Sequence, residues 1–311
     1  MSRRARTELV AVAGGDLHVG VWEAQDADDA GAPTILAIHG VTSSHLAWQH
    51  LADALPGVRI VAPDLRGRGR SNAVTGPAGM IGHADDLAAV AAAFGLGPTL
   101  VVAHSMGAFV AVAFAARHPR LVSRLVLVDG GLPLDAPAGL TPDELVAAIL
   151  GPTAARLNLR FDSAADYIDF WRDHPAFVSD WSSELEHYLA YDLAPAGDGR
   201  LRPATSYATT VEDTIDMNTT TTITDSLTAL SQPTVLITVP RGLQNEEPGL
   251  YAETYLPGIL AAHPAIAHER WPGLNHYTVV LSRAGADRLA QVVRAQLAQA
   301  EVDAVGSPLS R

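Results

Sequence analysis

The chain has 311 residues, of which 48% are hydrophobic and 18% are charged, and its formal net charge is −13 at pH 7. This composition suits a globular chain with a large core, and the negative average charge disfavours nucleic acid or an anionic membrane surface as a partner. Because it has no cysteine, no apolar run of about 18 residues and no signal-like start, we expect a cytoplasmic protein without disulfides or a thiolate nucleophile.

Two kinds of pattern alternate along the first part of the chain. Residues 8–13 and 17–23 are predicted to form a hairpin, and short apolar runs follow that are typical of strands covered on both faces. These runs lie at 34–38, 58–63, 99–103, 124–128 and 234–239. Amphipathic or alanine-rich segments predict helices at 43–55, 83–95, 106–117 and 285–300. The alternation predicts an α/β protein with a mainly parallel sheet and helices on both faces.

The alternation breaks after residue 130. From about 132 to 230 the chain is helical or irregular and rich in aromatic residues, and the run at 234–239 then resumes the sheet. Because the chain returns to the same sheet, an insertion is favoured over a separate domain with an unrelated role. We therefore predict a core formed by residues 1–132 and 230–311, with residues 133–229 as an inserted helical cap or lid.

A serine directly follows one of the buried strands. The sequence A-H-S-M-G at 103–107 joins the strand at 99–103 to the helix at 106–117. Such a strand–turn–helix needs small neighbours and presents the serine hydroxyl above the sheet, which is the arrangement of a nucleophile elbow. The usual pattern is G-x-S-x-G, and Ala103 replaces its first glycine. We predict that Ser105 is a nucleophile rather than a structural serine.

With this motif, the chain resembles the α/β-hydrolase superfamily over almost its whole length. The other motifs that carry the resemblance are His39-Gly40, the segment P-D-L-R-G-R-G-R-S at 63–71, and His276 in a late loop, and they stand in the family's order. The resemblance implies an α/β-hydrolase fold with a helical cap and an esterase- or lipase-like activity. The serine at the elbow disfavours haloalkane dehalogenases and epoxide hydrolases, which use an aspartate there.

The resemblance also implies where an oxyanion would bind. Family members use two backbone N–H groups, one from the residue after the nucleophile, here Met106, and one from the loop after the first parallel strand, here Val41. The alternative is that Gly40 only forms a tight turn. Asp64 and the loop that follows it are expected to shape the wall near Ser105.

His276 is the expected general base among the 12 histidines of the chain. It lies before the terminal helix, where the superfamily places its base, and Gly273 to Asn275 form a loop that can present the ring. The competing histidines occupy less suitable positions, since His104 flanks the elbow and both His118 and His263 precede prolines.

Two positions are open for the acid that orients this base. The commoner family position follows the strand at 234–239, but the loop there has no aspartate and offers only Glu246 or Glu247, several residues late. Asp129 stands directly at the end of the strand at 124–128, which matches the alternative acid position of haloalkane-dehalogenase-like members. We predict Asp129 as the acid, with Glu246 or Glu247 as the alternative.

These residues together predict a serine hydrolase that forms an acyl-enzyme. We expect it to cleave an ester-like bond (a carboxylic ester, thioester or lactone) of a small to medium, fairly apolar substrate, without a cofactor or a metal. The alternatives are a cofactor-free haloperoxidase or perhydrolase, a hydrolase of carbon–carbon bonds, and a receptor-like binding protein with very slow turnover. The expected partner is a small-molecule substrate, and the sequence leaves open whether the protein is a monomer or a homodimer.

Overall fold

The computed structural model describes residues 2–25, 31–135 and 139–306, so residues 136–138 of the expected insertion lie outside the described residues. An eight-stranded sheet runs through the molecule in the order β1-β2-β4-β3-β5-β6-β9-β10. Its strands are β1 (Arg6–Val12), β2 (Gly15–Trp22), β3 (Thr34–Ile38), β4 (Arg59–Pro63), β5 (Thr99–His104), β6 (Val122–Val128), β9 (Thr234–Thr238) and β10 (Ile266–Arg270). β2 pairs antiparallel with β1 and β4, and all other neighbours in the sheet are parallel.

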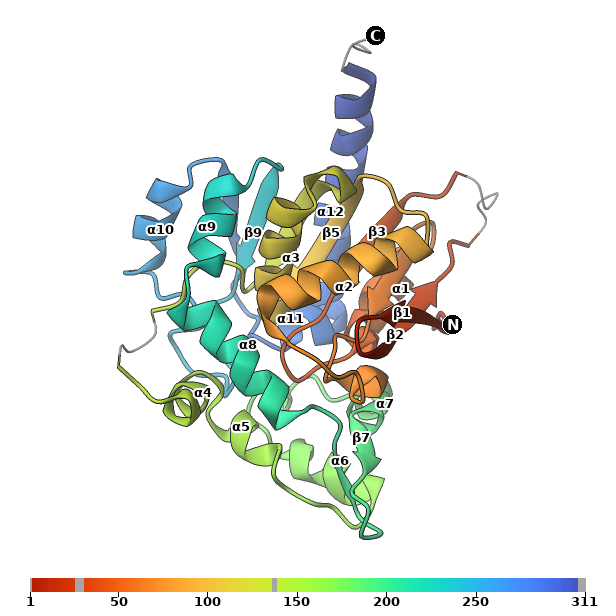
Figure 1. Cartoon of the computed structure of the whole chain (residues 1–311), viewed down its shortest axis with the longest axis vertical. Helices are drawn as coiled ribbons and strands as arrows, with labels where there is room; N and C mark the ends of the chain where they lie inside the picture. The colour runs from red at the N-terminus through yellow and green to blue at the C-terminus, as the bar shows by residue number, and fades with distance from the viewer. Residues whose placement is uncertain (1, 26–30, 136–138, 307–311) are drawn as a thin grey trace.

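Helices cover both faces of this sheet, as its side chains require. In β3, Ile35 and Ala37 join one apolar core while Leu36 and Ile38 join the other, because successive residues of a strand point to opposite faces. The first core is covered by η1 (His45–Trp48), α1 (Gln49–Ala54), α11 (Thr278–Leu281) and α12 (Arg283–Gly306). The second is covered by α2 (Gly79–Ala93), α3 (Met106–Arg117), α9 (Thr222–Ala229) and α10 (Leu256–Ala262) (Figure 1). The predicted α/β class is confirmed.

Between β6 and β9 the chain leaves the sheet. It forms α4 (Pro142–Leu150), α5 (Pro152–Arg156), α6 (Ala164–Arg172), α7 (Ser183–Tyr191), the small hairpin of β7 (Leu193–Pro195) and β8 (Leu201–Pro203), and then α8 (Tyr207–Thr219). Figure 1 shows these elements grouped at one end of the molecule, opposite the end at which α12 projects. We call residues 142–219 the inserted segment. The next helix, α9, packs on α3 of the core.

The strand β10 and the start of α2 are among the features that differ from the sequence prediction, and each has a physical reason. β10 was not predicted, because it is an edge strand in which only Ile266 is buried and an apolar run is not needed. α2 begins four residues before the predicted helix at 83–95 because its cap comes from a distant segment. Carboxylates of α8 accept hydrogen bonds from the first free N–H groups of α2, in the pairs Ala78 to Glu212, Gly79 to Asp213 and Met80 to Asp216.

The remaining short helices lie in loops of the core. They are η2 (Gly69–Ser71), which follows β4, and η3 (Pro119–Leu121), which joins α3 to β6. Across the described ranges, the structure contains no helix that combines the length and the apolarity needed to cross a bilayer.

Candidate active site

Ser105 stands on a sharp turn between β5 and α3. Its backbone has φ 54° and ψ −128°, a conformation that residues with a side chain rarely adopt. The turn depends on glycines around it. A Cβ on Gly107 would lie 2.4 Å from the carbonyl oxygen of Ile38, and one on Gly130 would lie 2.3 Å from that of Ser105. The amide of Ser105 donates to the carbonyl of Val128 at 2.9 Å, which fixes the turn to the neighbouring strand.

His276 lies in a loop that is hydrogen-bonded to the segment directly after β9. Its amide donates to the carbonyl of Arg241 at 2.9 Å, beside a bridge between Arg241 and Asn275. The side-chain oxygen of Asn275 accepts the amides of Tyr277 and Thr278 at 3.0 and 2.9 Å. In this position the Nε2 atom of His276 lies 3.0 Å from Oγ of Ser105.

Asp129 lies on the other side of the same imidazole. It directly follows β6, has φ 47° and is fully buried, and its Oδ2 atom lies 2.6 Å from Nδ1 of His276. Its amide donates to Ile237 at 2.7 Å, and its Oδ1 atom accepts the amide of Val239 at 3.3 Å. A carboxylate at this place selects the tautomer with a proton on Nδ1, which leaves Nε2 free to accept the proton of Ser105.

The two alternative acids lie elsewhere. Glu246 is exposed, and its Oε2 atom accepts the amide of Gln244 at 2.6 Å within its own loop. Glu247 is also exposed and precedes Pro248. The structure therefore brings Ser105, His276 and Asp129 together and leaves both glutamates outside this hydrogen-bonded chain.

The two predicted oxyanion donors lie on either side of Ser105. Met106 is the first residue of α3, where helix geometry provides no intrahelical acceptor for its N–H. Val41 follows Gly40, and a Cβ added to Gly40 would lie 3.1 Å from Cβ of Ser105, so the loop passes directly beside the serine. Within the described part of the chain, neither the amide of Val41 nor that of Met106 has a protein acceptor.

Comparison with known proteins identifies the family to which the chain belongs. Residues 33–239, about two thirds of the chain, match the sequence profile described as "alpha/beta hydrolase fold". The chain belongs to the α/β-hydrolase family. The predicted α/β-hydrolase fold and the resemblance to this family are therefore confirmed. Among solved structures of this fold, E-2-(acetamidomethylene)succinate hydrolase superposes with a TM-score of 0.74 over 94% of this chain and 100% of that one, at 19% identity.

Relatives within the family match the chain over part of their length. Lipase LipV of Mycobacterium tuberculosis is 41% identical over 135 residues, which are 43% of this chain and 48% of the lipase. The putative carbamate hydrolase RutD of Agrobacterium fabrum is 32% identical over 177 residues, or 56% of this chain and 63% of that protein. The chain thus spans about half to two thirds of the length of these curated relatives.

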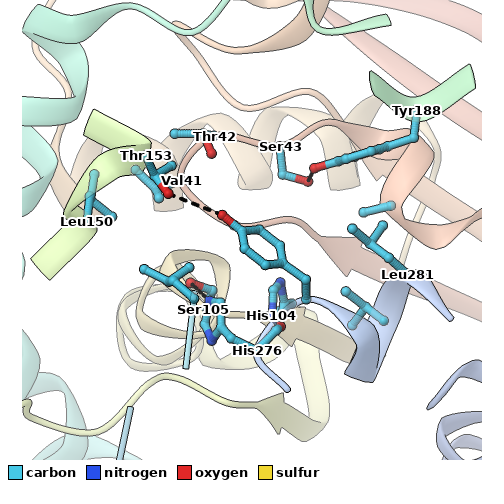
Figure 2. Close-up of a pocket in the computed structure, with 15 residues that line it drawn as sticks. Val41, Thr42, Ser43, His104, Ser105, Leu150, Thr153, Tyr188, His276 and Leu281 are labelled. Atoms are coloured by element: carbon cyan, nitrogen blue, oxygen red, sulfur yellow. Dashed lines mark hydrogen bonds between the residues drawn. The ribbon is translucent and has the colours of Figure 1, made fainter. Parts of the chain in front are cut away.

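Two pockets of this α/β-hydrolase meet at Ser105. One encloses about 380 Å³ of space between its lining atoms, with its opening included, and is lined by Thr42, Ser43, Thr153, Tyr188 and Tyr277 among others. Figure 2 shows Ser105, His104 and His276 together at one side of this pocket, with Leu150 and Thr153 of the inserted segment opposite Tyr188 and Leu281. The other pocket encloses about 450 Å³ and is almost wholly apolar, and it is lined by Met106, Phe109, Leu134, Ile149, Met217 and Leu250 among others.

Val41, Ser105, Leu150, Leu243 and His276 line both pockets. Ser105 therefore stands at their junction, and Leu150 belongs to the inserted segment, so that segment contributes to the wall beside the reactive hydroxyl. Sequence patterns could not predict that Leu150 lies beside Ser105, because in the sequence it is one more apolar residue of an amphipathic helix.

Two buried histidines near the site are held neutral. Burial lowers the pKa of His104 well below its usual value, and the neighbouring ring of His276 acts in the same direction. Its Nε2–H donates to the carbonyl of His276 at 2.8 Å, so a histidine that the sequence set aside supports the loop of the predicted base. Burial also lowers the pKa of His39 to about 4, and its Nε2 atom accepts the amide of Leu65 at 2.9 Å.

Sequence reasoning missed one further residue, Arg68. The motif that contains it was expected only to shape the wall near Ser105, but the Arg68 guanidinium is completely buried and contacts both Val41 and Met106. Three arginines at 66, 68 and 70, in a chain with far more acidic than basic residues, were the available signal. Arginine is rarely buried unless it is paired. The carboxylate that pairs with Arg68 is that of Asp213, far along the sequence.

Proposed function

We propose that this protein is a serine hydrolase that cleaves ester-like bonds through an acyl-enzyme. The observation that carries the proposal is the hydrogen-bonded chain from Asp129 through His276 to Ser105, with distances of 2.6 and 3.0 Å. A nucleophile, a base within hydrogen-bond reach and a third group that orients the base are the arrangement that acyl transfer requires. The similarity to a lipase and to a putative carbamate hydrolase supports the same class of reaction.

The reaction begins with a proton transfer. Nε2 of His276 accepts the proton of Ser105, and Oγ forms a bond to the substrate carbonyl carbon. The N–H groups of Val41 and Met106 bind the oxyanion that results, which lowers the barrier by several kcal/mol. Asp129 stabilises the charged imidazolium. As the intermediate collapses, the bond to the leaving oxygen breaks and that oxygen takes the proton from His276.

Water then releases the acyl group. The same imidazole takes a proton from a water molecule, and the hydroxide oxygen attacks the acyl-enzyme carbonyl. The bond to Oγ breaks, Ser105 regains its proton from His276, and the carboxylic acid leaves. Each proton that His276 takes up is returned in the same half-reaction, so the enzyme ends in its starting state.

We further propose that the inserted segment is a cap that helps to select the substrate. Leu150 and Thr153 lie in the pocket wall beside Ser105, and Tyr188 lies across the pocket from them (Figure 2). The apolar lining of the second pocket favours a substrate with an apolar group of small to medium size. The proposed cap lies within the predicted insertion at residues 133–229, of which α9 packs on α3 of the core. The substrate class is a further part of this proposal.

A fluorophosphonate probe and p-nitrophenyl acetate and butyrate test the reaction class. We expect one equivalent of probe to bind to the wild type, with turnover well above background. The variant Ser105→Ala should lose both, and Ser231→Ala, which changes an exposed serine outside the site, should keep both. Labelling that persists in Ser105→Ala would overturn the proposal. Labelling with turnover near background would favour the slow receptor-like alternative, and activity only with peroxide present would favour the perhydrolase.

A further inference from the structure

Arg68 contacts both residues of the proposed oxyanion site, Val41 at its carbonyl and Met106 at its side chain. Its Nε–H donates to the carbonyl oxygen of Val41 at 2.8 Å, and one of its Nη2 hydrogens points to Sδ of Met106 at 3.5 Å. A third N–H of the guanidinium donates to the carbonyl of Arg66 at 3.0 Å. The side chain is 0% exposed, so it is fixed on every side and cannot exchange these contacts for water.

The charge that balances Arg68 comes from the inserted segment. Nη1 of Arg68 lies 2.5 Å from Oδ2 of Asp213 on α8, and both side chains are completely buried. The other oxygen of Asp213 accepts the amide of Gly79 at 2.7 Å and lies 3.0 Å from Nε2 of His83, so this carboxylate is held on α2 of the core. An unpaired guanidinium would be costly at this depth. Arg68 can therefore keep its place only while α8 is seated on the core.

The loop that carries Arg68 meets α8 at a second point. The carbonyl of Gly67 accepts the amide of Ser206, directly before α8, at 2.8 Å. Gly67 has φ 77°, and a Cβ there would lie 2.8 Å from the side chain of Thr209. The backbone of this loop is thus packed closely against α8, which leaves little freedom for Arg68 to follow a displaced helix.

We propose that Arg68 is a positioning residue for the oxyanion donors and that Asp213 makes their position depend on the seating of the inserted segment. The proposal rests on the proposed function. The carbonyl and the N–H of Val41 lie on the two peptide planes that meet at its Cα, so a bond that fixes the carbonyl limits the rotation of the N–H. Oxyanion donors act mainly in the transition state, so their displacement lowers kcat more than it raises KM.

The structure offers a matched control in Arg66. This arginine lies in the same loop and is almost fully buried, and it forms a bidentate pair with Asp86 at 2.7 Å for both bonds. Within the described residues, its side chain donates to Asp86 and to the carbonyls of Thr75 and Ala13, and it forms no hydrogen bond with Val41 or Met106. Arg66→Met therefore removes a comparable buried pair, with a comparable loss of stability, without touching the proposed oxyanion site.

The test compares Arg68→Met, Arg68→Lys and Asp213→Asn with Arg66→Met. Active sites are counted with the fluorophosphonate, and kcat and KM are measured on p-nitrophenyl acetate. Inhibition by an alkyl trifluoromethyl ketone, which forms an oxyanion with the serine, is measured alongside. For Arg68→Met we expect kcat to fall by roughly 10- to 100-fold with KM within about 3-fold, and the ketone to bind more weakly by a similar factor. Arg66→Met should keep kcat and ketone affinity within about 2-fold.

The remaining variants decide whether the inserted segment takes part. Asp213→Asn should lower kcat and ketone affinity in the same proportion, and the double variant with Arg68→Met should be no worse than Arg68→Met alone. Arg68→Lys should recover part of the loss, and it serves in place of Arg68→Met if that variant does not fold. Equal kcat for the Arg68 and Arg66 variants would overturn the proposal. A wild type without label or turnover would instead defeat the proposed function itself.

Discussion

The sheet core and the inserted segment are held together by different interactions. In the core, adjacent strands exchange backbone hydrogen bonds and their apolar side chains fill both faces. The inserted segment also adds apolar side chains to one of these cores, but its short helices are joined in addition by buried polar groups, Arg156, Tyr167 and Asp192. Ser105, His276 and Asp129 all belong to the core. We therefore expect changes in the core site to affect the chemistry, and changes in the inserted segment, apart from Asp213 and its pair with Arg68, to affect stability and selectivity.

The largest effect should come from the acid at the end of β6. Asp129→Asn keeps the shape of the side chain but removes the charge and favours the wrong tautomer of His276, so kcat should fall by on the order of 10⁴-fold. Glu246→Gln, in the loop after β9, should leave kcat within about 2-fold because Glu246 bonds within its own loop. Steady-state kinetics on p-nitrophenyl acetate check both. Full activity of Asp129→Asn would remove it from the proposed mechanism.

This contrast also explains which parts of the site the sequence could predict. Asp129 and Ser105 directly follow strands whose apolar runs are plain in the sequence, so their places at the edge of the sheet follow from the strands. Glu246 stands eight residues beyond the end of β9, and its place depends on how a loop folds. Arg68 could not be assigned, because its partner Asp213 is supplied by α8, 145 residues later in the sequence.

The sequence predicted that the inserted segment is helical, but it did not predict the contacts that join its helices to one another. Its helices have few buried apolar residues, and in α6 only Tyr167 and Trp171 are buried. The contacts that fix it join Arg156 on α5 to Tyr167 on α6 and to Asp192 before β7. Charged residues that pair across distant positions give no periodic signal, so hydrophobic patterning cannot find them.

The second largest effect should be on the stability of the inserted segment. Arg156→Met leaves Asp192 buried without its partner and should cost about 3–5 kcal/mol. The double variant with Asp192→Asn should recover part of this loss, because no unpaired charge remains and the amide oxygen can still accept the Tyr167 hydroxyl at the place where Asp192 now accepts it at 2.5 Å. Urea unfolding measures both.

Hydrogen exchange then separates the two regions. In Arg156→Met, protection should fall first in residues 142–219, while β3, β5 and β6 keep the protection of the wild type. An equal loss of protection in the sheet would show that the two regions unfold as one unit. In that case the core and the inserted segment could not be treated as separate regions with separate effects on chemistry and selectivity.

A third effect is specific to the core and depends on pH. Burial lowers the pKa of His39 to about 4 from an ordinary value of 6.5, so below 6.5 the unfolded chain binds a proton that the folded chain does not. The contribution of neutral His39 to the free energy of unfolding is fully present above pH 6.5. About 3 kcal/mol of it is lost as the pH falls to 4. Protonation of Nε2 would also remove the acceptor for the Leu65 amide.

His39→Gln provides the check. It should destabilise the protein at pH 7.5, and the difference from the wild type should shrink by about 2.5 kcal/mol at pH 4.5, as measured by urea unfolding at both values. Exposed His187 supplies a control for the substitution itself, and His187→Gln should change stability little. If the difference in the free energy of unfolding between His39→Gln and the wild type stays constant with pH, the buried ring of His39 is not neutral.

The smallest effect should be on selectivity, and it comes from the inserted segment. Leu150 lies in the wall of both pockets beside Ser105, so Leu150→Ala enlarges the space next to the bound acyl group. Because a methylene group in an apolar pocket is worth about 1–3 kcal/mol, the ratio of kcat/KM for butyrate over acetate should rise roughly 3- to 10-fold, with kcat on acetate little changed. Leu159→Ala, at a leucine that is 41% exposed on the same segment, should leave the ratio unchanged. If Leu150→Ala instead lowers kcat on both esters equally, the inserted segment contributes to the chemistry, and the division between the two regions fails at that residue.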